Sequence, residues 1–271
     1  MNVKRWVPLL AAVALAAATA RWWPGWYWSW RTDNPVRRGA RLATSQGCLS
    51  CHGPTGRDET ANPGSRWGTV PSFYRGNLMM YVKSPGEVER FIADGAAGSA
   101  APAARGGYGS APDGKTAPPF HMRGFKDRLS PGQIEDLAAF VLAADGYLVP
   151  QDGPVARGSQ ISAKFACESC HGVGGSGGVS NPRSFTLHVP GWVGPDFPHL
   201  VSGQEEFRRW VLDGRSPRWA SSRPASFFLD RANLYMPAFR GNLSERDVDD
   251  LWAYLQWLRG RPGGRAEAPK E

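Results

Sequence analysis

The sequence is short of the features that mark nucleic-acid binding and many kinds of catalysis. Its net charge of +8 is spread along the chain, with +3 in residues 1–33, +3 in residues 34–150 and +2 in residues 151–271. A nucleic-acid-binding protein gathers its basic residues into one patch or stripe, so this distribution argues against nucleic acid as a partner. No phosphate-binding loop and no acid–base pair repeats or stands out, so the sequence indicates no substrate pocket.

The chain also lacks a long apolar run. A membrane-spanning helix needs about 20 apolar residues. The apolar stretch at residues 6–20 is shorter than that, and it follows Lys4 and Arg5. A basic start, an apolar stretch and a small-x-small tripeptide, here at residues 18–20, form an export signal. We therefore expect the chain to be delivered across a membrane.

Two fates of this N-terminal segment stay open. Residues 22–30 are rich in tryptophan, and such rings gather at membrane–water interfaces. Residues 1–33 are thus either a cleaved signal peptide or a retained membrane anchor that adds this interfacial segment to the apolar stretch. In both cases the positive-inside rule places residues 31–271 on the outer side of the membrane, which is the periplasmic side in a Gram-negative bacterium.

Cysteine is scarce, and all four cysteines belong to two copies of one pattern. Two thiols three residues apart lie on one helical turn, where each can add to a vinyl group of haem as a thioether. The adjacent histidine is then held beneath the iron. CxxCH is the pattern of c-type haem attachment. The two copies are Cys48-Leu49-Ser50-Cys51-His52 and Cys167-Glu168-Ser169-Cys170-His171.

Other uses of paired cysteines fit this sequence less well. A zinc ribbon places its two pairs about 15–20 residues apart, whereas Cys51 and Cys167 are much further apart. A thioredoxin-like redox site needs neither the adjacent histidine nor a second copy. A disulfide within either pair would be too local to staple a fold. We therefore expect two covalent haem c cofactors, one for each motif.

The surroundings of each motif are repeated as well. Pro35 and Pro154 precede the two motifs at a constant offset of 119 residues, and proline is favoured in the first turn of a helix. A second block, at an offset of 114 residues, contains Met122 in the first half and Met236 in the second. Each half is therefore predicted to have a leading helix, a haem motif, a long looped middle, a methionine and a closing helix.

The closing helices carry clear start signals. Ser130 and Gln133 form a capping box with proline at the first helical position, and Ser244 caps the matching helix of the second half. Apolar residues recur at helical spacing after both caps. Two shorter helices are predicted within the looped middles, over residues 85–94 and 204–213, each ended by the glycine that follows.

With this order of elements, each half resembles a class I (mitochondrial-type) cytochrome c domain, and residues 35–258 together resemble a tandem dihaem cytochrome c. The resemblance implies an all-α fold in which a few helices wrap one covalently bound haem, with long loops. It also implies that the first and last helices of each half cross, with a glycine against an aromatic ring. The matching pairs are Gly39 with Phe140 and Gly158 with Tyr254.

The domain organisation follows from the same comparison of halves. Residues 1–33 precede the first domain as signal or anchor. We expect the first cytochrome c domain at residues 34–150, the second at residues 151–259, and a disordered tail at residues 260–271. The looped middles are longer than those of compact family members.

The resemblance implies a methionine as the second axial ligand of each iron, opposite the histidine. Met236 is the only methionine of the second half and precedes a proline, as in the family. Met122 aligns with it, but three other side chains of the first half stay open as ligands. Those three are His121, Met79 and Met80.

Four further aromatic and histidine residues have two interpretations each. Trp67 and Trp192 lie at comparable places and could donate an indole N–H to a haem propionate, or they could be core aromatics. His188 and His199 are interpreted as loop or haem-edge residues rather than ligands.

Histidine and methionine fill both axial positions, which suits electron transfer better than substrate binding. The resemblance thus implies a non-enzymatic carrier of single electrons between redox protein partners, or a subunit of a respiratory complex in the membrane. The alternative is a dihaem enzyme, similar to a peroxidase or a thiosulfate dehydrogenase, with one iron open to a substrate. Dihaem thiosulfate dehydrogenases use a distal cysteine, and no cysteine remains here after haem attachment.

Overall fold

The computed structural model describes residues 12–15, 33–98 and 118–260, apart from residues 55, 57, 58, 66, 67, 75 and 195. The predicted cleavage site, the tryptophan-rich segment, Trp67 and nearly all of the predicted tail lie outside the described residues. Among the helices that are described, none has the length and apolarity that spanning a bilayer demands.

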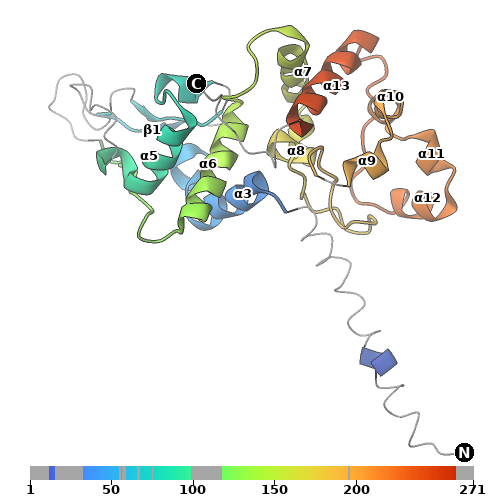
Figure 1. The fold of residues 1–271 in the computed structure, drawn as a ribbon, viewed down its shortest axis with the longest axis horizontal. Coiled ribbons are helices and arrows are strands. Elements are labelled where there is room, and N and C mark those ends of the chain that lie inside the picture. Colours follow the sequence, from blue (N-terminus) through green and yellow to red (C-terminus); the bar gives the residue numbers. More distant parts are fainter. Residues whose placement is uncertain are drawn as a thin grey trace, which may run out of the picture.

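The described chain is helical in both halves, as predicted (Figure 1). The first half contains α3 (Pro35–Ser45), α4 (Leu49–His52), β1 (Thr60–Ala61), β2 (Thr69–Val70), the 3-10 helix η2 (Asn77–Met80), α5 (Pro85–Gly98) and α6 (Pro131–Asp145). The second half contains α7 (Gly153–Lys164), α8 (Cys167–His171), the 3-10 helix η3 (Val173–Gly175), α9 (Phe197–Leu200), α10 (Gln204–Asp213), α11 (Pro217–Ala220), α12 (Arg223–Leu229) and α13 (Glu245–Arg259).

The closing helices begin at the predicted caps. The Ser130 side chain accepts the backbone N–H of Gln133, and the Gln133 side chain accepts the backbone N–H of Ser130 at 3.0 Å. Ser244 and Asp247 make the same reciprocal pair at the start of α13. Both predicted capping residues are therefore confirmed, because each satisfies backbone N–H groups that have no partner within the helix.

In the first half, α3 crosses α6 at the predicted glycine. A Cβ atom placed on Gly39 would lie 1.9 Å from the carbonyl oxygen of Asp136 and 2.7 Å from the Cβ of Phe140. Only a residue without a side chain fits between two backbones at this distance. The predicted pairing of Gly39 with Phe140 is confirmed.

The second half repeats this crossing between α7 and α13. A Cβ on Gly158 would lie 2.0 Å from the carbonyl oxygen of Asp250 and 2.8 Å from the Cβ of Tyr254. The predicted pairing of Gly158 with Tyr254 is therefore confirmed as well. The two halves share one packing arrangement, although the offset between them changes from 119 to 114 residues.

An ion pair that sequence reasoning missed braces each crossing. The Arg38 guanidinium donates to both carboxylate oxygens of Asp136 at 2.7 Å. Arg157 makes the same two bonds to Asp250, also at 2.7 Å. The two aspartates are buried, so the two-bond geometry of the guanidinium compensates the carboxylate for the water it loses.

The middles are more regular than predicted. α10 ends at Gly214 as predicted, in the left-handed conformation with φ of 71°. Regular helix in α5 also ends where predicted, at Gly95 (φ 75°, ψ 179°), but a further turn follows it. The prediction of a looped middle is wrong for the segment between Gly214 and the second methionine, because α11 and α12 occupy part of it.

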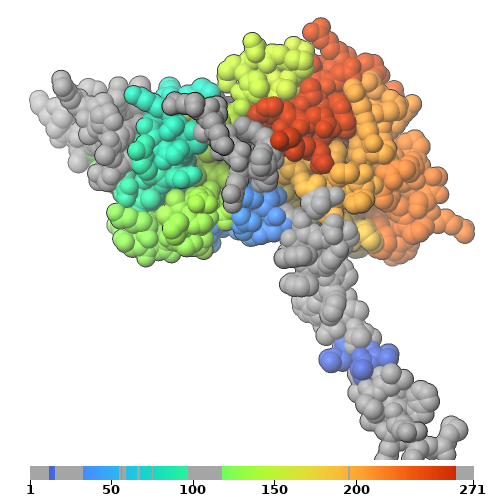
Figure 2. Space-filling model, in the orientation of Figure 1, coloured from blue at the N-terminus to red at the C-terminus, as the bar shows by residue number. Residues whose placement is uncertain are grey.

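The two halves pack against each other and lie side by side in the space-filling view (Figure 2). The amide of Asn34, just before α3, donates to the carbonyl oxygen of Ser176 in the second half at 3.0 Å. A Cβ on Gly178 would lie 2.1 Å from Nε of Arg37. The start of the first helix is therefore held against the loop that follows the second haem motif.

We predict that Gly158→Ala destabilises the second half by about 1–3 kcal/mol, because the new methyl group must push the two helix backbones apart. Gly132→Ala is the control. A Cβ at Gly132, in the first turn of α6, meets nothing within 4 Å, and alanine favours helix by up to about 1 kcal/mol. Urea unfolding followed by circular dichroism measures both. Equal stability of the two variants would contradict the close crossing.

Candidate haem sites

The two short helices α4 and α8 gather the predicted attachment residues. His52 donates its backbone N–H to the carbonyl oxygen of Cys48 at 3.1 Å, so the two thiols and the imidazole of the first motif share one helical turn. In the second motif, residues 167–171 form one short helix. None of the four cysteines is in a disulfide. The local fold therefore leaves all four sulfur atoms free for a thioether.

Burial keeps the first thiol of each motif protonated. Desolvation raises the pKa of Cys48, and it raises the pKa of Cys167 to about 11. A thiol with such a pKa is a poor nucleophile towards oxidants and metals. Addition of S–H across a vinyl double bond needs no electron acceptor, since the sulfur and the hydrogen both end up on the former vinyl carbons.

The imidazoles are oriented by one backbone carbonyl each. Nδ1 of His52 lies 2.7 Å from the carbonyl oxygen of Pro71, and Nδ1 of His171 lies 2.8 Å from that of Pro190. A carbonyl can only accept, so Nδ1 carries the proton and Nε2 keeps the lone pair that a metal needs. Burial lowers the pKa of both imidazoles, which also favours this neutral, metal-binding form.

An aromatic ring supports each imidazole. The ring centres of His52 and Phe73 are 5.1 Å apart, and those of His171 and Trp192 are 5.2 Å apart. Trp192 is thus the counterpart of Phe73, at the offset of 119 residues, and not of Trp67 as the sequence comparison suggested. The Trp192 ring lies beside the His171 imidazole and packs against the hydrophobic core of the second half, as the core-aromatic interpretation expects.

The candidate methionines are held at the same place in both halves. Met122 and Met236 are half-buried and pack against the hydrophobic cores of their own halves. A Cβ on Gly95 would lie 2.6 Å from the carbonyl oxygen of Met122, and a Cβ on Gly214 would lie 2.6 Å from that of Met236. The glycine that ends the middle helix therefore lets the methionine segment approach closely.

The other candidate ligands of the first half point elsewhere. His121 is exposed, as expected for the neighbour of a residue that faces the core in an extended segment. The exposed fractions of Met79 and Met80 are 49% and 60%. These positions favour Met122 over the three alternatives.

Of the two remaining histidines, His188 is a loop residue as interpreted from the sequence, whereas the loop interpretation is wrong for His199, which lies in α9. Nδ1 of His188 lies 3.1 Å from the carbonyl oxygen of Thr186, within its own loop. His199 is exposed at the end of α9.

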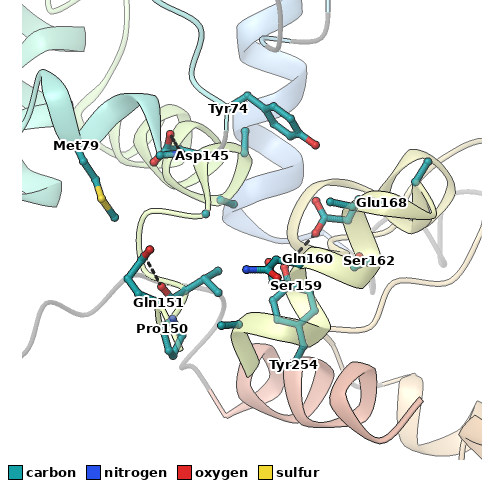
Figure 3. A pocket seen from close by; sticks show the side chains of 18 residues that line it. Tyr74, Met79, Asp145, Pro150, Gln151, Ser159, Gln160, Ser162, Glu168 and Tyr254 are labelled. Carbon is teal, nitrogen blue, oxygen red and sulfur yellow. Dashed lines mark hydrogen bonds between the residues drawn. The ribbon is translucent and has the colours of Figure 1, made fainter. Parts of the chain in front are cut away.

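A cavity of about 250 Å³ lies between the two halves (Figure 3). Its wall includes Met79 and Asp145 from the first half and Glu168 from the second. The hydroxyl of Tyr254, also in the wall, donates to the Glu168 carboxylate at 3.0 Å. Of the candidate ligands, the open alternative Met79 lies in this wall, whereas the four cysteines, His52, His171, Met122 and Met236 do not line the cavity. It is a feature of the interface between the halves.

The residues present fit a covalently bound haem in each half. Two unbonded thiols and an imidazole with a fixed proton lie on one helical turn, which is partly open to solvent, and an aromatic ring lies beside the imidazole. Each motif has a half-buried methionine in its own half. Sequence reasoning missed the two proline carbonyls, yet the offset of 119 residues extends to them and relates Pro71 to Pro190.

Comparison with known proteins agrees with this geometry. The family described as "Cytochrome c" matches residues 36–145, and the family described as "Cytochrome C oxidase, cbb3-type, subunit III" matches residues 153–255. Cytochrome c-555 of Methylococcus capsulatus (strain Bath) is 27% identical over 148 residues, which cover 49% of this chain and 90% of that protein. No solved structure matches. The chain therefore contains two cytochrome c domains in tandem, of the type that binds haem c covalently.

Proposed function

We propose that this protein is a dihaem c-type cytochrome of the class I type that transfers single electrons. The observation that carries the proposal is the duplication of the whole site. Each half has the same helical turn of two thiols and an imidazole, the same carbonyl on Nδ1 and the same placement of a methionine. The repetition of all these parts in both halves supports one haem in each domain, with ligands on both faces of its iron.

Different residues have different proposed roles in holding the haem. Cys48 and Cys51 would hold one haem by thioether bonds, and Cys167 and Cys170 would hold the other. His52 and His171 would bind the iron next to these cysteines. Met122 and Met236 are the proposed ligands on the opposite face, and their half-buried positions support this role. The bound haem supplies the reversible one-electron chemistry of its iron.

The side chains of the protein prepare these sites for electron transfer rather than for catalysis. The carbonyls of Pro71 and Pro190 fix the imidazole rings and raise their basicity as ligands. Filling the sixth position with a thioether leaves no place for a substrate and raises the reduction potential. The buried cores around Met122 and Met236 exclude water, which limits the solvent reorganisation that accompanies electron transfer.

We further propose that residues 34–150 and 151–259 form the two domains and lie on the periplasmic side of the inner membrane, exported or anchored through residues 1–33. The family description for residues 153–255 names a subunit of a cbb3-type oxidase. That similarity supports a partner within a respiratory chain, with this protein passing electrons to or within a membrane complex.

The purified protein is expected to contain two covalent haems and to be inert to carbon monoxide. Sulfur ligands close both irons, so the reduced protein should give no spectral change with the gas, and the oxidised protein should show the far-red sulfur-to-iron charge-transfer band. Absorption spectroscopy measures both. Rapid carbon monoxide binding at one haem of the native protein would overturn the carrier proposal and favour a dihaem enzyme.

Replacing one proposed methionine ligand should open only its own haem. Met236→Ala and Met122→Ala are each expected to remove about half of the far-red band and to make one haem reactive to carbon monoxide. Met80→Ala, which changes an exposed side chain, serves as the control and should leave both haems closed. If Met80→Ala opened a haem and Met122→Ala did not, the assignment of the first ligand would be wrong.

A further inference from the structure

In each domain, a buried asparagine side chain forms two hydrogen bonds with the backbone just before the proposed methionine ligand. This stretch of chain is called the methionine segment. Oδ1 of Asn62 accepts the backbone N–H of Phe120, and Nδ2 of Asn62 donates to the carbonyl oxygen of Phe120, both at 3.1 Å. Asn181 makes the same two bonds to the backbone of Leu234, at 2.8 and 3.1 Å. Phe120 and Leu234 each lie two residues before a proposed methionine ligand. Both asparagines are 5% exposed.

The asparagines are themselves anchored by a repeated hairpin. The backbone N–H of Asn62 donates to the carbonyl oxygen of Gly68 at 2.7 Å, and that of Asn181 donates to Leu187 at 2.8 Å. In the first domain the hairpin is β1 paired with β2. In the second domain, residues 179–189 form it through a bridge between Ser180 and His188, at the offset of 119 residues.

The same hairpin ends next to the other axial ligand. Residues 60–70 lead directly into Pro71, whose carbonyl oxygen accepts the Nδ1 proton of His52. Residues 179–189 lead into Pro190, which does the same for His171. One hairpin in each domain therefore contacts the segments of both proposed ligands, the imidazole through a proline carbonyl and the methionine segment through an asparagine amide.

We propose that Asn62 and Asn181 are positioning residues for the sixth ligand, and that each holds the methionine sulfur on its iron. This inference rests on the proposed function, because it requires that Met122 and Met236 bind iron. Each methionine lies two positions after the residue that the asparagine binds, within about 7 Å of chain. Fixing that backbone therefore limits how far the sulfur can withdraw.

The amide group is the chemical reason for asparagine at both positions. The residue that the asparagine binds presents one backbone donor and one backbone acceptor, and a carboxamide satisfies both at once. A carboxylate could only accept, and an apolar side chain would leave the N–H and C=O of this residue without their asparagine partner. The same choice in both domains, on hairpins of the same register, indicates a shared requirement of the ligand segment.

The test compares variants of the full chain with both haems attached. Asn181→Ala removes both bonds, and Asn181→Asp keeps the size of the side chain while removing the donation to Leu234. Asn233→Ala is the matched control. Asn233 precedes Leu234 in the same segment, but its exposed side chain accepts from Arg183 instead, at 3.1 Å.

The readouts are the far-red band of the oxidised protein and the rate of carbon monoxide binding to the reduced protein. Loss of two hydrogen bonds is expected to raise the population of detached sulfur, and with it the carbon monoxide binding rate of one haem, by about tenfold or more in Asn181→Ala. Asn181→Asp should show a smaller increase, and Asn233→Ala should match the native protein. Asn62→Ala should affect the first haem in the same way.

The outcomes separate this proposal from the one it rests on. Absence of the far-red band in the native protein would mean that methionine is not the ligand, and the proposed function would fail first. If the native protein has the band, and Asn181→Asp and Asn62→Ala bind carbon monoxide no faster than Asn233→Ala, the positioning role is overturned while the carrier function stands. Asn62→Ala and Asn181→Asp keep the test decisive even if Asn181→Ala does not fold.

Discussion

The close crossing of the first and last helix is the constraint on which each domain depends. At Gly39 and Gly158 the two backbones approach so closely that no side chain fits between them. The adjacent arginines then reach across to buried aspartates on the closing helices. Because the haem motif follows the leading helix within a few residues, this crossing fixes where the thiols and the imidazole lie relative to the core.

Two further elements position the rest of each site. A hairpin after the motif carries a proline carbonyl to the imidazole and an asparagine to the methionine segment. A glycine at the end of the middle helix then lets the methionine backbone pack closely. The segments of the two proposed ligands His52 and Met122, 70 residues apart in the sequence, are thereby both hydrogen-bonded to one hairpin.

Strong local patterns made much of this predictable. A few neighbouring residues are enough to predict the serine caps and the helix ends at Gly95 and Gly214. The glycine–aromatic crossings were predicted from the resemblance to a known family, and the duplication gave a second copy of each feature for comparison. The contacts of Asn62 and Pro71 were not predictable in this way. Each of these hydrogen bonds joins a backbone group to a partner far away in the sequence. No local residue pattern indicates which carbonyl or N–H the partner will contact. α11 and α12 were missed because they are short, with four and seven residues.

Electron transfer by this protein depends most on the attachment of porphyrin to both motifs. Protease digestion of the purified chain, followed by mass spectrometry of the peptides that contain residues 48–52 and 167–171, tests this directly. Both peptides are expected to carry the mass of one haem on their two cysteines. A peptide from either motif with two free thiols, or with the two sulfurs joined in a disulfide, would contradict the account.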